Sequence, residues 1–362
     1  MIDKVQKIMS GFDYAAVTPR RVEAALKREH RDCNDLGALL SPAAAVYLED
    51  MAVLARDVSL RFFGRNVSLY TPLYIANYCV NRCLYCGYNH DNHIRRARLS
   101  PAEIAAEAAA IAATGLKDIL LLTGESRIYS SPAYIGQAVE ILNRYFPSVG
   151  LEIYPLRLEQ YGRLHELGSD FISVYQETYD PALYDRVHLS GPKKNYSWRF
   201  GANERALAAG FRGASFGVLL GLGDFRRDVL ACAAHALLVQ EKYPQAEIGF
   251  SVPRIRPYPN REKNETGIGE AQLLQIILSL RLFMPWAGIS LSTRESAHFR
   301  DNCIGLGITR LSAGVSTGVG GHLGGEKGDQ QFHKADPRSA PEICRALVSR
   351  GYQPVFRDYI RV

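Results

Sequence analysis

The chain has 362 residues, of which 47% are hydrophobic, 10% aromatic and 22% charged. This is the composition of an ordinary globular protein with enough apolar material for a large core. The net charge of +6 does not single out a nucleic-acid-binding protein, because basic residues are spread along the chain among nearly as many acids.

Two further classes of protein find no support in the sequence. No segment approaches the roughly 20 apolar residues of a membrane span, and Met1–Lys7 lacks the apolar core of a signal peptide. Three of the 7 cysteines crowd between positions 79 and 86, which favours reduced thiols in a metal protein over disulfides. We therefore expect a cytoplasmic protein.

The chain up to about residue 65 has the pattern of helices. Thr18-Pro19 and Ser41-Pro42 each place a proline directly after a helix-capping residue. No strand-like run occurs there, so we predict an N-terminal helical extension over residues 1–66.

From Val67 onwards, short apolar runs alternate with amphipathic stretches, which indicates a parallel sheet covered by helices. The predicted strands are Ser68–Ile75, Asp118–Thr123, Gly150–Pro155, Phe171–Gln176, Ala214–Leu220, Glu247–Val252, Gly288–Ser292 and Thr309–Ser312. The predicted helices are Pro101–Ala113, Pro132–Arg144, Glu159–Leu167, Ala202–Ala209, Asp228–Gln240, Glu270–Phe283 and Pro341–Ser349.

Eight such units fit an α/β fold of the (β/α)₈ TIM-barrel type over residues 67–362, with the C-terminal segment closing the barrel. A doubly wound sheet is the alternative. In a barrel, active-site residues lie at the carboxyl ends of the strands, and each motif below follows a predicted strand.

A cysteine cluster follows the first predicted strand. Cys79, Cys83 and Cys86 have the spacing C-x₃-C-x₂-C. A closed electron-transfer cluster needs four thiolates, so three leave one iron open to chelate a small molecule. A zinc site completed by His90 or His93 is the competing interpretation. The other cysteines share no local motif; they are Cys33, Cys232, Cys303 and Cys344.

This spacing, the aromatic Tyr85 before the third cysteine, and the place after the first strand resemble the signature of the radical S-adenosylmethionine (SAM) enzymes. The resemblance implies a [4Fe-4S] cluster held by Cys79, Cys83 and Cys86, with SAM bound at the open iron. It also implies that one electron from the cluster cleaves SAM, and that the resulting 5′-deoxyadenosyl radical takes a hydrogen atom from the substrate.

Two more segments resemble the SAM-binding elements of that superfamily. Thr123-Gly124-Glu125 resembles its Gly-Gly-Glu motif, which accepts hydrogen bonds from the amino group of SAM; a simple turn is the alternative. Gly217, Leu219 and Gly221 match its glycine-rich adenine element, and a plain buried strand followed by a turn is the alternative.

Charged residues also follow the fourth and sixth predicted strands, and each allows more than one role. Glu177 is a candidate acceptor for the ribose hydroxyls, or else a solvated or salt-bridged carboxylate. Arg254 and Arg256 follow the sixth predicted strand; they either bind the carboxylate of SAM or shape the substrate side of the pocket, and structural ion pairing is the alternative.

Leu291–Ser296 closes the seventh predicted strand and gives the resemblance its finest detail. With the segments above, it looks like the aromatic amino acid lyase branch of the superfamily. The guanidinium of Arg294 matches a carboxylate with two parallel hydrogen bonds, and Ser292 and Thr293 can add donors. The resemblance implies that these residues anchor a free amino acid. The alternative is a surface pair between Arg294 and Glu295.

Within this branch the tyrosine lyase of thiamine biosynthesis fits best, which implies cleavage of L-tyrosine to 2-iminoacetate (dehydroglycine) and p-cresol. Two alternatives belong to the same branch, namely the tyrosine lyase of [FeFe]-hydrogenase maturation and a tryptophan lyase. Two rivals belong to different classes of protein, namely an iron–sulfur electron carrier and a zinc-binding interaction protein. Implied partners are thiazole synthase and a reducing flavodoxin or ferredoxin. The basic residues 93–98 form either a solvated loop or a docking face for an acidic electron donor.

Overall fold

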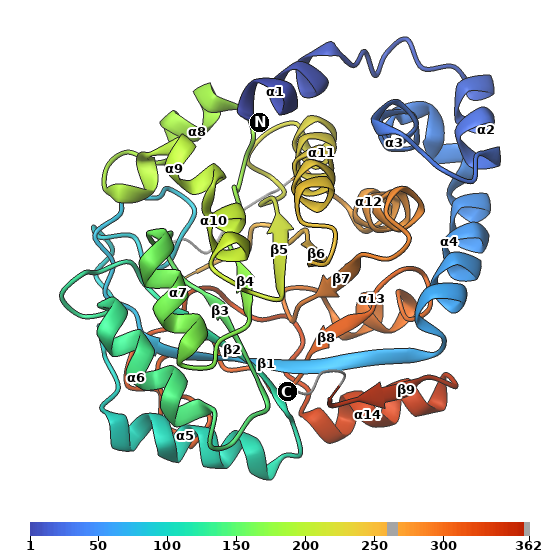
Figure 1. The fold of residues 1–362 in the computed structure, drawn as a ribbon. Coiled ribbons are helices and arrows are strands. Elements are labelled where there is room, and N and C mark those ends of the chain that lie inside the picture. Colours follow the sequence, from blue (N-terminus) through green and yellow to red (C-terminus); the bar gives the residue numbers. More distant parts are fainter. Residues whose placement is uncertain (259–266, 358–362) are drawn as a thin grey trace.

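The structure is a computed structural model that describes residues 1–258 and 267–357. Its centre is a barrel of eight parallel strands in which consecutive strands pair and the last pairs with the first (Figure 1). The strands are β1 (Asn66–Ala76), β2 (Asp118–Thr123), β3 (Ser148–Glu152), β4 (Phe171–Ser173), β5 (Gly213–Gly217), β6 (Glu247–Ser251), β7 (Gly288–Leu291) and β8 (Arg310–Ser312).

Closure of the barrel confirms the predicted fold class and shows that the doubly wound alternative was wrong. All eight predicted strands are present. The fourth and fifth are shorter than predicted, because Val174–Gln176 and Val218–Leu220 leave the ladder and enter the loops that carry polar residues. A further short strand, β9 (Gln353–Val355), was not predicted and pairs in parallel with the start of β1.

Helices follow the strands and surround the barrel (Figure 1). Those that were predicted are α5 (Pro101–Ala113), α6 (Pro132–Leu142), α7 (Leu158–Glu166), α10 (Ala202–Ala208), α11 (Phe225–Lys242), α12 (Glu270–Phe283) and α14 (Ala340–Ser349). Short helices that were not predicted are α8 (Pro181–Val187), η2 (Pro192–Lys194), α9 (Tyr196–Phe200) and α13 (Ala297–Asn302). These four are too short to show a clear helical period in the sequence.

The N-terminal segment is helical, as predicted. It forms α1 (Ile2–Gly11), α2 (Pro19–Lys27), α3 (Cys33–Leu40), η1 (Pro42–Tyr47) and α4 (Leu48–Phe63). The Thr18 side chain caps α2 by accepting from the backbone N–H of Arg21, whereas Ser41-Pro42 begins a 3₁₀ helix. Whether residue 66 separates two units stays a prediction, and residues 358–362 of the predicted barrel segment lie outside the described residues.

The N-terminal helices pack on the outside of the barrel. Buried apolar side chains of α2, α3 and α4, among them Val22, Leu39 and Met51, form one cluster with Leu278 and Leu282 of α12. Because this burial removes apolar surface from water, it anchors the segment to the outer helix layer.

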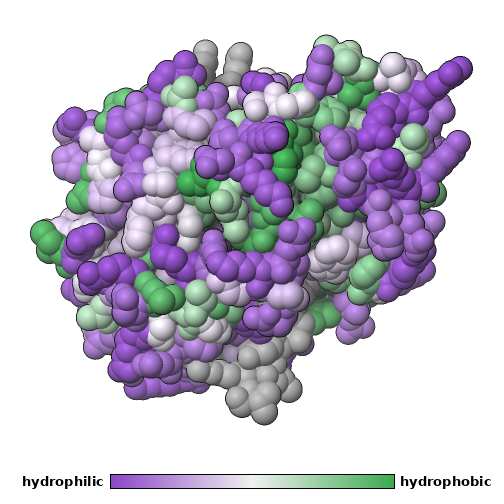
Figure 2. All heavy atoms as spheres, turned by 45° about the horizontal axis from the view of Figure 1, so that its top comes forward, coloured by the Kyte–Doolittle hydropathy of each residue, from purple (hydrophilic) through white to green (hydrophobic). Residues whose placement is uncertain are grey.

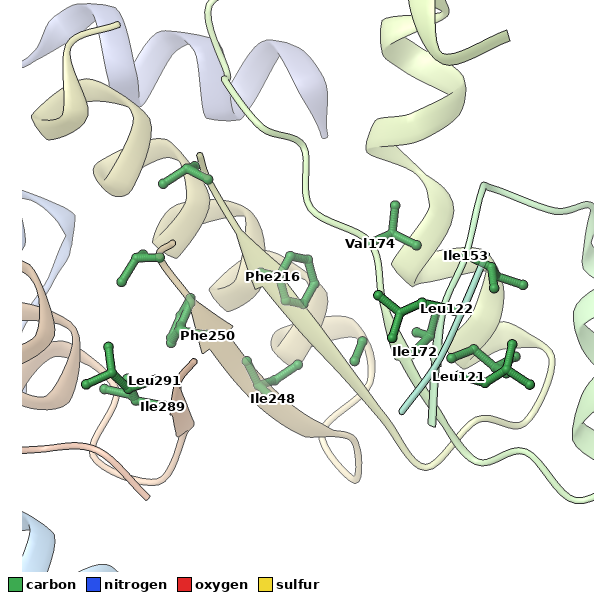
Figure 3. Close-up of a cluster of buried hydrophobic side chains, with 14 of the residues drawn as sticks. Leu121, Leu122, Ile153, Ile172, Val174, Phe216, Ile248, Phe250, Ile289 and Leu291 are labelled. Carbon is green, nitrogen blue, oxygen red and sulfur yellow. The ribbon is translucent and has the colours of Figure 1, made fainter. Parts of the chain in front are cut away.

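The main apolar core lies between the strands and the surrounding helices. Figure 3 shows side chains from neighbouring strands, including Ile172, Phe216 and Ile289, gathered in this layer. The ring of Phe216 contacts His235 of α11, with centroids 5.0 Å apart. Inside the amino end of the barrel, by contrast, small residues such as Gly150 and Ser215 line a cavity of about 660 Å³.

Among the described residues, no one helix is both long and apolar enough to cross a bilayer; a bent pair, Cys33–Leu40 with Pro42–Phe63, meets the requirement by length and composition only. The face drawn in Figure 2 shows hydrophilic residues with hydrophobic ones between them.

His235 gives the outer layer a testable dependence on pH. Its ring is buried, stacks on Phe200 with centroids 3.8 Å apart, and shares a hydrogen bond of 2.9 Å with the Tyr179 hydroxyl. Burial lowers its pKa to about 3, whereas the pKa of a histidine in an unfolded chain is roughly 6.5. The folded state therefore excludes a proton that the unfolded state binds, so stability is complete above the unfolded pKa and is lost as pH falls below it.

We predict that His235→Gln makes the free energy of unfolding less dependent on pH. Below the unfolded pKa, the wild-type slope should exceed that of the variant by up to about 1.4 kcal/mol per pH unit. Urea denaturation of the apoprotein between about pH 5 and 7 measures this. The control is His30→Gln, at an exposed histidine; equal slopes in the two variants would contradict the assignment.

Candidate active site

Two adjoining cavities lie at the carboxyl end of the barrel. The first, of about 110 Å³, is lined by Cys79, Cys83 and Cys86 from the loop after β1. The second, of about 120 Å³, is lined by Cys86 and by Arg294 after β7. Residues that line both include Tyr74, Cys86, Glu152, Tyr175, Glu177, Lys193 and Gln331. The structure thus brings the three cysteines together beside the predicted substrate anchor.

The three thiols are free, and two of them face amide donors. Asn81 Nδ2 lies 3.6 Å from Cys79 Sγ, and Gln331 Nε2 lies 3.7 Å from Cys86 Sγ. Burial raises the pKa of Cys79, and it raises that of Cys83 to about 12. The thiolate forms therefore need a bound cation to compensate for burial, and iron supplies such a charge.

This arrangement fits the iron–sulfur cluster that the sequence predicts. The thiolates of a cubane bind different irons, so they share a cavity without converging on one point. A zinc site, by contrast, requires side chains that converge on one ion. Within residues 1–258 and 267–357, no group of three or more His, Cys, Asp or Glu side chains is arranged to hold such an ion. His90, the proposed fourth ligand of the zinc alternative, is largely exposed and lies 3.1 Å from Asp91.

The segment Thr123–Glu125 begins with the last residue of β2 and lies against the cysteine loop. Glu125 Oε2 accepts from Asn81 Nδ2 at 2.6 Å, and burial raises the pKa of this carboxyl group. A Cβ at Gly124 would lie 2.3 Å from the backbone oxygen of Tyr78, so only glycine allows this approach. The buried Thr123 Oγ1 finds no hydrogen-bond partner among the described residues. These acceptors suit the cationic amino group of a ligand.

Glu177 lies at the centre of a buried charge cluster. Its Oε1 is 2.7 Å from Lys193 Nζ and 3.4 Å from Arg199 Nη2. Burial by itself raises the pKa of Glu177, but the two cations outweigh this effect and lower it, so the carboxylate is ionised. Among the described residues, Glu177 is the one residue other than glycine that has a positive φ, which is 74°. A strained backbone of this kind is common at functional sites.

Arg294 enters the second cavity together with Ser292 and Thr293. Its guanidinium carbon stacks 3.5 Å from the centre of the Phe332 ring, and burial lowers the pKa of the group. The predicted alternative, a surface pair between Arg294 and Glu295, was wrong. Glu295 is buried and pairs instead with Arg254 and, at 2.8 Å, with Arg256.

The remaining predicted cofactor residues divide into two groups. Leu219 and Tyr85 line the second cavity, and the Tyr85 hydroxyl is 2.6 Å from His188 Nε2. Gly217 and Gly221 are required for the course of the backbone. A Cβ at Gly217 would lie 2.4 Å from the Ser251 oxygen, and Gly221 has a φ of 108°. Arg254 lines neither cavity and forms the structural ion pair that the sequence left open.

Sequence reasoning missed several residues of the cavities, of which Glu152 is the most informative. It ends β3 and lines both cavities. Burial raises its pKa to about 7, although Arg294 and Arg199 oppose the rise. A charged residue in the middle of the otherwise apolar predicted strand Gly150–Pro155 was the available signal. Asn81, Gln331 and Phe332 carry no comparable signal because they lie in loops, and Lys193 carries none because it lies in the short helix η2.

Comparisons with known proteins agree with this geometry. The model of the radical SAM superfamily matches residues 73–235, and that of the Biotin and Thiamin Synthesis associated domain matches residues 251–353. The chain is 39% identical to the 2-iminoacetate synthases of Escherichia coli (strain K12) and Salmonella typhimurium, over 94% of this chain and 91% of each relative. The solved [FeFe]-hydrogenase maturase HydG from Carboxydothermus hydrogenoformans superposes with a TM-score of 0.87 at 31% identity, covering 98% of this chain and 83% of that one.

The buried cluster around Glu177 leads to a prediction about stability. Glu177→Gln leaves Lys193 and Arg199 without a buried countercharge, which should lower the free energy of unfolding by about 3 kcal/mol. Chemical denaturation measures the difference. Glu166→Gln is the matched control, because Glu166 pairs with Arg163 on the exposed surface and should cost less than about 1 kcal/mol. Equal effects of the two changes would refute the buried charge cluster.

Proposed function

The chain belongs to the radical SAM superfamily and, within it, to the 2-iminoacetate synthases, and on that basis we propose that it cleaves the Cα–Cβ bond of L-tyrosine to 2-iminoacetate and p-cresol. Methionine and 5′-deoxyadenosine are the co-products. One structural observation carries the assignment of substrate class: the cavity of the three thiols adjoins a cavity that contains Arg294, and Cys86 lines both. An amino acid held there lies beside the cofactor site.

Residues of the first cavity would hold the cofactors. Cys79, Cys83 and Cys86 would bind the [4Fe-4S] cluster, while Glu125 with Thr123 would accept from the amino group of SAM. Glu177 would accept from the ribose hydroxyls, since both of its ion pairs use Oε1. When bound, these cofactors supply the electron transfer and the hydrogen abstraction that start the cleavage.

Residues of the second cavity would bind and orient the amino acid. The stacking of Arg294 on Phe332 fixes its guanidinium plane, which presents parallel N–H donors to the carboxylate. Ser292 and Thr293 line the same wall and can add hydroxyl donors. Glu152 has a pKa raised to about 7 and can hold or accept a proton beside the substrate amino group.

The same family membership supports a role in making the thiazole of thiamine, because the chain also matches the Biotin and Thiamin Synthesis associated domain. 2-Iminoacetate would then pass to thiazole synthase. A reducing flavodoxin or ferredoxin would supply the electron. Both partners are proposals that rest on the family.

An anaerobic assay tests the proposed reaction. Protein reconstituted with iron and sulfide should, with SAM, dithionite and L-tyrosine, form p-cresol and 5′-deoxyadenosine in comparable amounts, as measured by liquid chromatography. Omitting tyrosine should abolish p-cresol. An iron–sulfur electron carrier would form no 5′-deoxyadenosine, and indole-type products from tryptophan alone would show a different substrate.

Arg294→Ala tests the carboxylate anchor. We expect the variant to keep its iron and sulfide but to bind tyrosine more weakly by about 2–5 kcal/mol, the cost of removing a buried charge partner. Equilibrium binding under anaerobic conditions measures the change. Arg163→Ala, at an exposed arginine, should bind tyrosine like the wild type, and unchanged affinity in Arg294→Ala would refute the role.

A further inference from the structure

Gln331 connects the two cavities of the site. It lies in the irregular segment between β8 and α14 and lines both cavities. Its backbone is held against the cysteine loop, since a Cβ at Gly87 would lie 2.4 Å from the Gln331 oxygen. Its N–H also donates to the Thr317 oxygen at 3.1 Å. The next residue, Phe332, stacks under Arg294. The position of Gln331 is therefore determined from two sides.

The side-chain amide of Gln331 has one acceptor end and one donor end, and both are used. Its Oε1 accepts from the Tyr74 hydroxyl at 3.0 Å, and its Nε2 lies 3.7 Å from Cys86 Sγ. Tyr74 is buried and its pKa is raised above the usual value by burial, so its hydroxyl stays protonated and acts as the donor. A hydroxyl that donates to Oε1 leaves the NH₂ group to face the sulfur.

We propose that Gln331 is a positioning residue that raises the reduction potential of the bound cluster by donating a hydrogen bond to the Cys86 thiolate, and that Tyr74 fixes this orientation. The inference deepens the proposed function and rests on it, because it requires the cluster at Cys86. Neither residue touches the reacting atoms in this role.

The physical reason is electrostatic. Reduction moves one electron from a chemical or protein reductant into the cluster, with no bond or proton changing place, and the added negative charge is shared with the thiolate sulfurs. An N–H donor at one of these sulfurs stabilises the reduced form more than the oxidised form. Loss of the donor should therefore shift the midpoint potential to more negative values.

Two substitutions remove the donor in different ways. Gln331→Met keeps the length of the side chain without any N–H group, and Gln331→Glu keeps the oxygen that faces Tyr74 while replacing the NH₂ group with an acceptor. Gln330→Met is the matched control. Gln330 is in the same segment, its Oε1 accepts from the Thr317 hydroxyl at 3.2 Å, and it lines neither cavity.

The experiment is a redox titration of the reconstituted holoenzymes, followed by electron paramagnetic resonance, in the absence of SAM and tyrosine. At a fixed solution potential, the ratio of reduced to oxidised cluster should fall about tenfold in both Gln331 variants, a shift of about 59 mV for one electron. Gln330→Met should match the wild type. Tyr74→Phe should give a smaller shift in the same direction, because the amide can then rotate its oxygen toward the sulfur.

An unchanged midpoint in both Gln331 variants with full iron and sulfide content would overturn the proposal. An equal shift in Gln330→Met would do so too, because it would indicate a general effect of the loop. Failure of both Gln331 variants to bind iron and sulfide would show a role in cluster assembly instead. If the wild type forms p-cresol but the midpoint potential does not shift in the Gln331 variants, only this inference is refuted. If the midpoint potential shifts in the variants but the wild type forms no p-cresol, only the proposed function is refuted.

Discussion

The site depends on keeping three thiols side by side in a buried cavity, where negative charge is costly. Burial opposes ionisation of Cys79 and Cys83, and the thiolates also repel one another. The proposed cluster would have to compensate for most of this cost. The protein adds amide donors from Asn81 and Gln331 and the nearby cation of Lys193, which lowers the pKa of Cys83 against the effect of burial.

Two separate ion-pair systems keep the charges of the site apart. Glu177 pairs with Lys193 and Arg199 near the thiols, and Glu295 pairs with Arg254 and Arg256 behind the second cavity. Since Glu295 is occupied in this way, the neighbouring Arg294 is directed to Phe332 and the cavity. The consecutive residues Arg294 and Glu295 therefore have different functions: one would bind the substrate, and the other supports the wall behind it.

The segment between β8 and α14 lies against the cysteine loop and contributes residues to the walls of both cavities. Gln331 contacts Cys86, the proposed cluster ligand, and Phe332 contacts Arg294, the proposed substrate anchor. The Tyr88 hydroxyl donates to the Thr317 oxygen at 3.2 Å, so the cysteine loop and this segment support each other. The contacts of Tyr88 with Thr317 and of Gln331 with Cys86 join residues that are 229 and 245 positions apart in the chain.

The sequence by itself determined the barrel and most of the residues that we assign to the site. Strand–helix alternation is a local pattern, and Cys79–Cys86, Thr123–Glu125 and Leu291–Ser296 are short motifs at strand ends, so all of them can be recognised from neighbouring residues. Only the tertiary structure decided that Glu295 pairs with Arg254, that Glu152 enters the same cavities, and that Gln331 reaches Cys86. Such contacts depend on closure of the barrel and on side-chain packing between distant loops, and no local period or spacing encodes them.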